Sequence, residues 1–381
     1  MEPDAERLAQ EFVTLCEIAS PSRSEAGLCR RLQERFKELH ADYIGEDRSA
    51  KETGADCGNL LVRFKGTLPR PAIFFACHMD TVTPAQGIRV QRRGDLFTSS
   101  GDTILGGDDK SGIAACIEAM RVLADTGAPH RPVEFVFTTC EEIGLLGAKA
   151  FDPKTLMARE GYALDGSGFG EVITRAPAMN RLTATVSGLA AHAGLHPEWG
   201  VNAIMLAAKA LADMPCGRID DESTVNFGTI RGGLATNIVP DQVVIEGEVR
   251  SHNPKTLEQL SRAIKDRFVD TGGLWCDPSG EARGRPGIAV QIEQEFPAMR
   301  LADDAPLLCR IDQAAGLVQM PLAHTASGGG SDANIFNGKG LATAVVATGM
   351  TNVHATDEQL SLADLQALTR LVLALLTEVP F

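Results

Sequence analysis

Paired cysteines and long apolar runs are both missing from this sequence. None of its nine cysteines stands in a CxxC pair, and its 381 residues contain no apolar run long enough to span a membrane. The first residues, MEPDAERLAQEF, are acidic and amphipathic, which does not fit a signal peptide. An odd number of cysteines, many of them within apolar segments, predicts reduced thiols. We therefore expect a cytoplasmic protein.

Positive charge and aromatic side chains are also scarce. The chain has 36 Lys and Arg against 50 Asp and Glu, a formal net charge of −14, and only 5% of its residues are aromatic. A negative field of this kind disfavours nucleic acid and anionic membranes as partners. A nucleotide-binding protein is disfavoured too, because neither GxxxxGK[ST] nor GxGxxG follows the early predicted strands.

Short apolar runs in the first half of the chain predict buried strands. Asn59–Phe64, Ala72–Cys77 and Val133–Thr139 are bounded by polar or turn residues, and Ser111–Ala124 repeats apolar residues at a helical period. Strand, helix and strand in this order predict a right-handed crossover and a largely parallel sheet. We expect an α/β domain with a mixed, largely parallel sheet and helices on both faces.

The pattern changes near residue 176. Leu182–Ser187 and Gln242–Val249 alternate apolar and polar residues, which is typical of half-exposed antiparallel strands. The sequence therefore predicts a smaller α+β domain over residues 176–291, inserted in a first domain formed by residues 1–175 and 292–381.

Ionisable side chains follow several of the predicted strands. Since ligands of open α/β sheets bind beyond the carboxyl ends of the strands, these side chains can converge. Two histidines with several carboxylates suit Zn²⁺, Mn²⁺ or Co²⁺, and two ions bridged by one carboxylate are a common use of such a set. The candidates are His78, Asp80, Asp108, Asp109, Glu141, Glu142, Asp165 and His354.

Each of these signals taken alone has a simpler structural explanation. A histidine at a strand end, such as His78, is more often a satisfied structural group, and Asp108 or Asp109 before a helix fits an N-cap. Glu141 and Glu142 could form a solvated loop, although adjacent carboxylates after a buried strand are costly unless something neutralises them. The combination favours a metal site, in which one glutamate binds metal and the other acts as a base.

The segments that carry these residues resemble the M20 family of co-catalytic zinc metallopeptidases. The matching segments are ACHMDTV, LGGDDKSGIAA, TTCEEIGLLGA, YALDG, GLAAHAGLHPEWGVNA, GGLATNIVPD, EVRS, GGGSDANIF and NVHATDE. They occur in the family's order and cover nearly the whole chain. GGDDKSG, TTCEEIG and the HATDE ending resemble the peptidase T (tripeptide aminopeptidase) branch most, which implies a zinc-peptidase-like fold.

The resemblance implies a ligand set for two zinc ions, with cobalt or manganese as alternatives. His78 and Asp165 would hold one ion, and Glu142 and His354 would hold the other. Asp108 would bridge them, because the family's motif is Asp-x-Lys. The inserted domain would then be the family's lid and dimerisation domain.

The resemblance also implies catalytic and substrate-binding residues. Asp80 would orient His78, and Glu141 would be the general base. His192, acting across the interface of a homodimer, would stabilise the oxyanion. Taken without the resemblance, His192 is a histidine in a turn and Arg250 a surface strand residue, while a helix N-cap near Ser331 is at least as good an explanation for that segment. The implied substrate-binding residues are Asn237, Arg250, Gly330 and Ser331.

We therefore expect a two-metal hydrolase that cleaves an amide bond of a small peptide, as a peptidase T-like aminopeptidase. An N-acyl amino acid deacylase or a carboxypeptidase of the same family is the alternative within this chemistry. A non-catalytic metal-binding scaffold on the same fold is the alternative from another class. It would be expected to lose the base or a ligand, whereas here the base and all five ligands are present.

Overall fold

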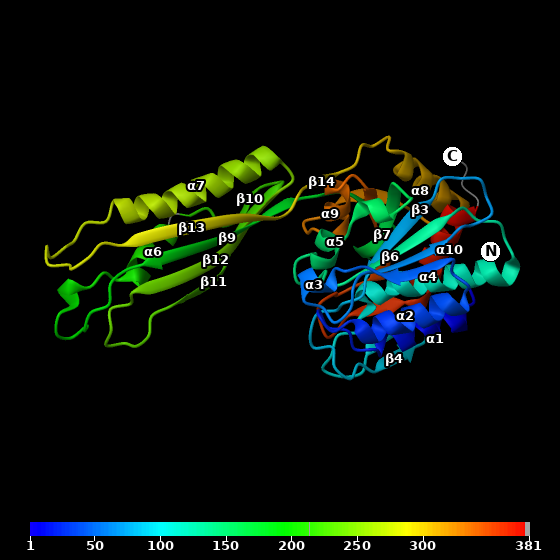
Figure 1. Cartoon of the computed structure of the whole chain (residues 1–381), viewed down its shortest axis with the longest axis horizontal. Coiled ribbons are helices and arrows are strands. Elements are labelled where there is room, and N and C mark those ends of the chain that lie inside the picture. The colour runs from blue at the N-terminus through cyan, green and yellow to red at the C-terminus, as the bar shows by residue number, and fades with distance from the viewer. Residues whose placement is uncertain (213, 378–381) are drawn as a thin grey trace. The chain divides into compact units, whose positions relative to one another are not determined.

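The computed structural model describes residues 1–212 and 214–377, and the chain divides into two compact units (Figure 1). The first unit comprises Met1–Arg175 and Met299–Phe381, and the second comprises Ala176–Ala298. The sequence places the return to the first domain at residue 292. In the structure, β13 (Gly287–Phe296) pairs with β9 of the second unit along its length, so the chain returns only at residue 299.

A nine-stranded sheet forms the centre of the first unit, in the order β1-β2-β6-β3-β7-β16-β8-β14, with β15 beside β8. The neighbours β6, β3, β7 and β16 are parallel, whereas β1, β2 and β6 pair antiparallel. The predicted mixed, largely parallel α/β architecture is therefore confirmed. The strands are β1 (Tyr43–Glu46), β2 (Leu60–Phe64), β3 (Ile73–His78), β6 (Val133–Thr138), β7 (Glu160–Ser167), β8 (Glu171–Ala176), β14 (Met299–Arg300), β15 (Ala323–Ala326) and β16 (Ala342–Met350).

Helices pack on both faces of this sheet. Neighbouring residues of a strand point to opposite faces. Phe74 meets Phe336 of α9, whereas Phe75 stacks on Phe135, which in turn stacks on Phe36 of α2. The helices of the unit are α1 (Ala5–Cys16), α2 (Ala26–Glu38), α3 (Ala50–Thr53), α4 (Gly107–Thr126), α5 (Leu146–Ala150), η1 (Pro153–Thr155), α8 (Pro306–Leu317), α9 (Asp332–Gly338) and α10 (Leu362–Thr377).

Local sequence explains where two of these helices begin. Asp4 caps α1 by accepting a hydrogen bond from the Arg7 amide, and the apolar period that follows is buried. Ser331 caps α9 in a capping box with Asn334. A small sheet of β17 (Gln359–Ser361), β5 (Leu96–Ser99) and β4 (Val90–Arg93) completes the unit.

The second unit is a five-stranded antiparallel sheet, in the order β10-β11-β12-β9-β13, with α6 and α7 packed against it. Its apolar core comes from alternate strand residues and the inner stripes of the two helices, as the alternating pattern predicts. Its elements are β9 (Ala178–Ser187), η2 (Pro197–Trp199), α6 (Ala203–Leu211), β10 (Gly217–Asp220), β11 (Ser223–Gly232), β12 (Gln242–Ser251), α7 (Pro254–Gly273) and β13.

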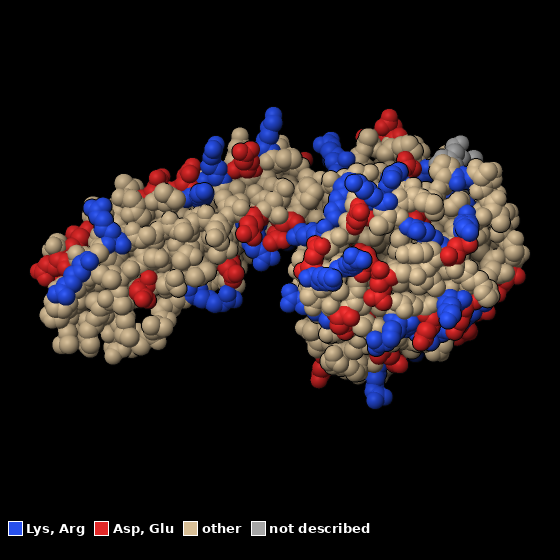
Figure 2. All heavy atoms as spheres, viewed as in Figure 1, with Lys and Arg blue, Asp and Glu red and all other residues tan. Residues whose placement is uncertain are grey.

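The surface carries both signs of charge. Figure 2 shows acidic and basic side chains interspersed over the visible face of each unit. Among the residues that the structure describes, no helix combines the length and the apolar character needed to cross a membrane.

Candidate metal centre and active site

The candidate ligands gather at one edge of the central sheet of the first unit. His78 ends β3, and Asp165 lies near the end of β7, which is parallel to β3. Glu142 follows β6, the other parallel neighbour of β3, and His354 follows β16. Because parallel strands deliver their carboxyl ends to the same edge, residues far apart in sequence meet there.

Asp108 enters from the start of α4. Asp108 and Asp109 have non-helical backbone angles and are joined by a cis peptide bond, so the regular helix begins after them. Oδ1 of Asp108 lies 3.0 Å from Nε2 of His78, and its Oδ2 lies 3.1 Å from Nε2 of His354. One carboxylate thus faces both histidines, as a bridging ligand would.

Two groups of possible metal ligands share this carboxylate. Asp165 Oδ1 lies 3.5 Å from His78 Nε2, and His78, Asp108 and Asp165 form the first group. Glu142 Oε1 lies 3.0 Å from His354 Nε2, and Asp108, Glu142 and His354 form the second group. Within each group the ligand atoms lie within 4.8 Å of one another. The structure therefore brings together the five residues that the resemblance implies as ligands.

The contacts fit a metal centre better than a simple network of ion pairs. Glu142 Oε1 is buried and has no hydrogen-bond partner among the described residues, even though His354 Nε2 is close to it. When a carboxylate oxygen and an imidazole nitrogen bind the same cation, they lie close together without being aligned for a hydrogen bond. The donors are imidazole nitrogens and carboxylate oxygens, which suit Zn²⁺, Mn²⁺ or Co²⁺.

The pKa values of the metal-free protein also fit a site for cations. The neighbouring carboxylates of Asp108 and Glu142 raise the pKa of His354 to about 10. Burial opposes protonation of His78, but its contacts with the carboxylates of Asp108 and Asp165 outweigh this effect and raise the pKa of His78 well above the usual value. Burial raises the pKa of Asp165 to about 6. Protonated imidazoles thus neutralise the buried carboxylates, and bound cations would take their place.

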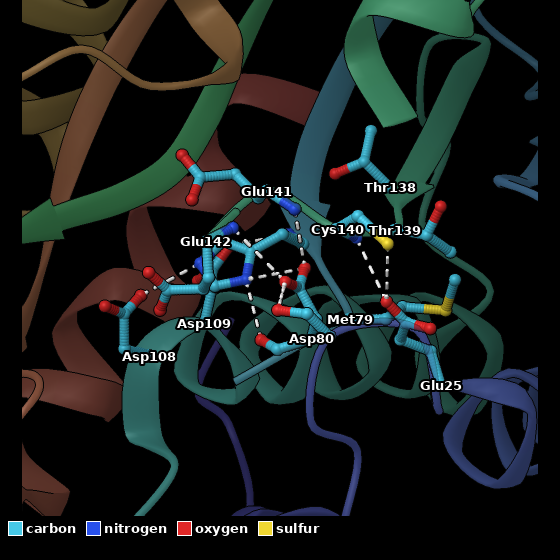
Figure 3. Close-up of polar contacts among 12 residues, drawn as sticks. Glu25, Met79, Asp80, Asp108, Asp109, Thr138, Thr139, Cys140, Glu141 and Glu142 are labelled. Atoms are coloured by element: carbon cyan, nitrogen blue, oxygen red, sulfur yellow. Dashed lines mark hydrogen bonds and ion pairs between the residues drawn. The ribbon is translucent and has the colours of Figure 1, made fainter. Parts of the chain in front are cut away.

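Glu141 and Asp109 lie beside the two groups without belonging to either of them. The side chain of Glu141 extends away from Asp80 (Figure 3). Burial raises the pKa of Glu141 well above its usual value, and the charge of Asp165 adds to this. Asp109 accepts a hydrogen bond from the backbone amide of His78 at 3.2 Å, so it supports the site as a neighbour.

Asp80 has a broader structural role than the sequence suggests. Nδ1 of His78 is hydrogen-bonded to the backbone carbonyl of Asp80 at 2.8 Å, whereas the Asp80 carboxylate lies 3.7 Å away. That carboxylate instead accepts hydrogen bonds from Ser22 Oγ and from the amides of Glu141 and Glu142. The main chain of Asp80 therefore orients the histidine, and its side chain holds the loop after β6.

Two buried acids near the site were missed by sequence reasoning. Glu358 accepts hydrogen bonds from the amides of Gly106 and Asp108, at 2.8 and 3.0 Å. Asp332 accepts one from Thr138 Oγ1 at 2.5 Å, and burial raises the pKa of Asp332 to about 7. Glu358 lies in the HATDE segment and Asp332 beside Ser331, but neither position signals burial next to a metal centre.

The remaining candidates lie in different units. His192, Asn237 and Arg250 belong to the second unit, where the Ala193 amide donates to the Asn237 carbonyl at 2.9 Å. Arg250 Nε lies 2.8 Å from Glu248 Oε1, so this guanidinium already has an acidic partner. Gly330 and Ser331 belong to the first unit, and the Ser331 hydroxyl accepts from the Ala333 amide as the cap of α9.

Comparisons with known proteins agree with the geometry. The model of peptidase family M20/M25/M40 matches residues 74–378. The chain is 38% identical over 373 residues to the uncharacterized protein YqjE of Bacillus subtilis (strain 168), with 98% of both chains covered.

Two solved structures are similar over 98% of both chains. They are aminopeptidase PepT from Bacillus cereus ATCC 10987, with 38% identity and a TM-score of 0.87, and a tripeptidase from Staphylococcus aureus subsp. aureus mu50, with 33% identity and a TM-score of 0.90. The family resemblance of the sequence motifs is thereby confirmed. The chain belongs to peptidase family M20/M25/M40, as a metallopeptidase of its peptidase T-like branch.

Proposed function

We propose that this chain is a two-zinc aminopeptidase that removes N-terminal residues from small peptides such as tripeptides. The observation that carries the proposal is the double contact of Asp108, whose two oxygens each face a different histidine. The names of the similar solved structures, an aminopeptidase and a tripeptidase, support the substrate class. Cobalt or manganese would suit the same donors.

The residues that would hold the ions are those of the two ligand groups. His78 and Asp165 would bind one ion, Glu142 and His354 the other, and Asp108 both. Two divalent cations, when bound, would lower the pKa of a shared water and polarise the scissile carbonyl group.

Glu141 is the general base in this proposal. It follows β6 directly before Glu142, and its carboxylate belongs to neither ligand group. It would take a proton from the attacking water and pass it to the leaving amine. We expect Glu141→Gln to lower kcat by about 10²–10⁴-fold, because the amide cannot accept that proton. Metal analysis should still find two ions per chain, and a normal turnover rate would disprove the assignment.

His192 would donate a hydrogen bond to the oxyanion. Its Nδ1 accepts hydrogen bonds from the amides of Gly194 and Leu195, both at 3.2 Å. A neutral imidazole whose Nδ1 accepts carries its proton on Nε2, so Nε2 is available as a donor. We propose that this donor serves the active site of a partner subunit, which would make the functional form a cytoplasmic homodimer with the second unit as lid and dimerisation domain.

Substrate recognition is assigned to residues of both units. Asn237 and Arg250 would contact the peptide from the second unit, with Arg250 exchanging Glu248 for the substrate carboxylate. Gly330 and Ser331 would contact it from the loop before α9, where the Ser331 hydroxyl accepts from the Ala333 amide and keeps its own O–H to donate.

A panel of free, N-acetylated and C-amidated tripeptides, each with zinc, cobalt or manganese, tests the proposal. We expect hydrolysis of the free tripeptide, loss of activity with a chelator and no cleavage of the N-acetylated peptide. Cleavage of acylated substrates alone would favour the deacylase alternative. The absence of any chelator-sensitive hydrolysis would favour the non-catalytic scaffold.

A further inference from the structure

The loop that carries Glu141 is held by side chains from three other segments. Strand β6 ends at Thr138, and the next four amides all donate to side-chain acceptors instead of to a neighbouring strand. The four bonds are Thr139 N to Asn59 Oδ1 at 3.1 Å, Cys140 N to Glu25 Oε1 at 3.0 Å, Glu141 N to Asp80 Oδ1 at 2.8 Å, and Glu142 N to Asp80 Oδ2 at 3.2 Å. The loop conformation thus depends on these acceptors.

Cys140 is the turning point of the loop. Its φ is 55°, in the left-handed region that non-glycine residues rarely adopt. Such a conformation persists only where the surroundings enforce it. Figure 3 shows Glu25 beside Cys140, on the side of the loop opposite to the Glu141 carboxylate.

Glu25, at the start of α2, holds Cys140 in this left-handed conformation. Its side chain is fully buried, and Oε1 accepts from the amides of Arg23 and Cys140, both at 3.0 Å, and from the Cys140 thiol at 3.4 Å. Although Glu25 occupies the N-cap position of α2, its side chain makes no capping bond to that helix. A buried carboxylate aimed away from its own helix is costly, which points to a role at the loop.

We propose that Glu25 is a positioning residue for the general base: it fixes the Cys140 backbone so that the next residue, Glu141, leaves the turn in the direction that catalysis needs. This inference rests on the proposed function, since it assigns Glu25 a task at the same site. Misplacement of a catalytic group by about 1 Å is enough to lower turnover by about 10²-fold.

A metal site at Glu25 is the rival interpretation. Ligand atoms of Glu25, Asp56 and Cys57 lie within 4.8 Å of one another, and Oε2 of Glu25 is buried without a hydrogen-bond partner among the described residues. However, Asp56 is exposed and already accepts from the Ala26 amide at 2.9 Å, and Oε1 of Glu25 already has three donors. The hydrogen bonds therefore favour the positioning role, and metal counting separates the two.

The test compares Glu25→Ala, Glu25→Gln and the control Asp56→Ala in the full chain with zinc. Asp56 accepts a hydrogen bond from the Ala26 amide at the start of α2 and has no hydrogen bond to Cys140. Asp56→Ala therefore measures the effect of a disturbed α2 start alone. For Glu25→Ala we expect kcat to fall about 10–100-fold, with KM within about twofold and zinc content unchanged. Glu25→Gln should recover most of kcat, because an amide oxygen still accepts from Cys140. Asp56→Ala should match the wild type.

Several outcomes would overturn the proposal. A third zinc ion per chain in the wild type that both Glu25→Ala and Asp56→Ala lose would make Glu25 a ligand of a separate metal site. An unchanged kcat would leave it without a positioning role, and an equal loss in Glu25→Gln would mean that its charge matters instead of its hydrogen bonds. Equal loss in Asp56→Ala would indicate a general effect on α2. If the wild-type protein shows no chelator-sensitive hydrolysis of the tripeptide, the proposed function fails first.

Discussion

The two halves of the candidate metal centre differ in burial. His78 and Asp165 lie on adjacent parallel strands, and the His78 side chain is only 2% exposed. His354 and Glu142 come from loops, and the His354 side chain is 50% exposed although Glu142 is only 6% exposed. The carboxylates do not follow this division, since the Asp165 side chain is 12% exposed, so the contrast lies in the histidines: His78 belongs to the packed core and His354 opens toward solvent. We infer that the first half anchors the centre and that the second exchanges more readily.

Removal of the shared ligand should have the largest effect, because it breaks both halves at once. Asp108→Ala takes away the carboxylate that faces both histidines. We expect loss of both ions and of all measurable peptide hydrolysis, measured by metal analysis after gel filtration and by activity. Retention of one tightly bound ion would show that the halves are independent of the bridge.

Metal occupancy should then separate the halves. His354→Ala is expected to lose about one ion per chain and to keep the other, because His78 and Asp165 remain in place on their strands. In the wild-type protein, limiting chelator should remove the ions in two phases, and His354→Ala should lack the faster phase. A single phase in the wild type would contradict a difference between the halves.

The stability of the metal-free protein provides a third comparison. His78→Ala leaves Asp108 and Asp165 without their buried partner, and the free energy of unfolding should fall by about 3 kcal/mol or more. His354→Ala removes a half-exposed partner and should cost about 1 kcal/mol or less. Urea denaturation with chelator present measures both values. Equal losses would show that burial does not distinguish the two histidines.

The smallest expected effect is a pH dependence of stability in the metal-free protein. Asp108 and Glu142 raise the folded-state pKa of His354 to about 10, above the unfolded value of about 6.5. The contribution of His354 to the free energy of unfolding is therefore complete below about pH 6.5 and is lost as the pH rises toward 10. Denaturation between pH 6 and 10 should show this loss in the wild type but a weaker one in His354→Ala. If stability depended on pH in the same way in the wild type and in His354→Ala, His354 would not be the cause of the loss.

The candidate ligands could be selected from the sequence because most of their signals are local. Most stand directly after an apolar run or beside paired glycines, whereas His354 lies several residues after such a run, and only the M20-like resemblance assigned the individual roles. The supporting acids were not predictable in this way. Glu25 meets Cys140 across 115 residues, and Glu358 meets Asp108 across 250, so only the folded chain shows their partners.

Weak patterns account for the missed elements. β4 and β5 have mostly exposed or half-exposed residues and no clear alternation, so no strand was expected there. The boundary placed at residue 292 falls inside β13, which runs from Gly287 to Phe296 and pairs with β9 of the second unit. The roles of His192, Asn237, Arg250, Gly330 and Ser331 stay predictions, since they depend on a bound substrate and a partner subunit.

The most direct test of the two-ion centre is a crystal structure of the zinc-loaded protein with anomalous scattering recorded at the zinc edge. We expect two peaks about 3.5–4 Å apart, with the Asp108 carboxylate between them, one peak beside His78 and the other beside His354. A single peak, or two peaks that do not share Asp108, would contradict the account.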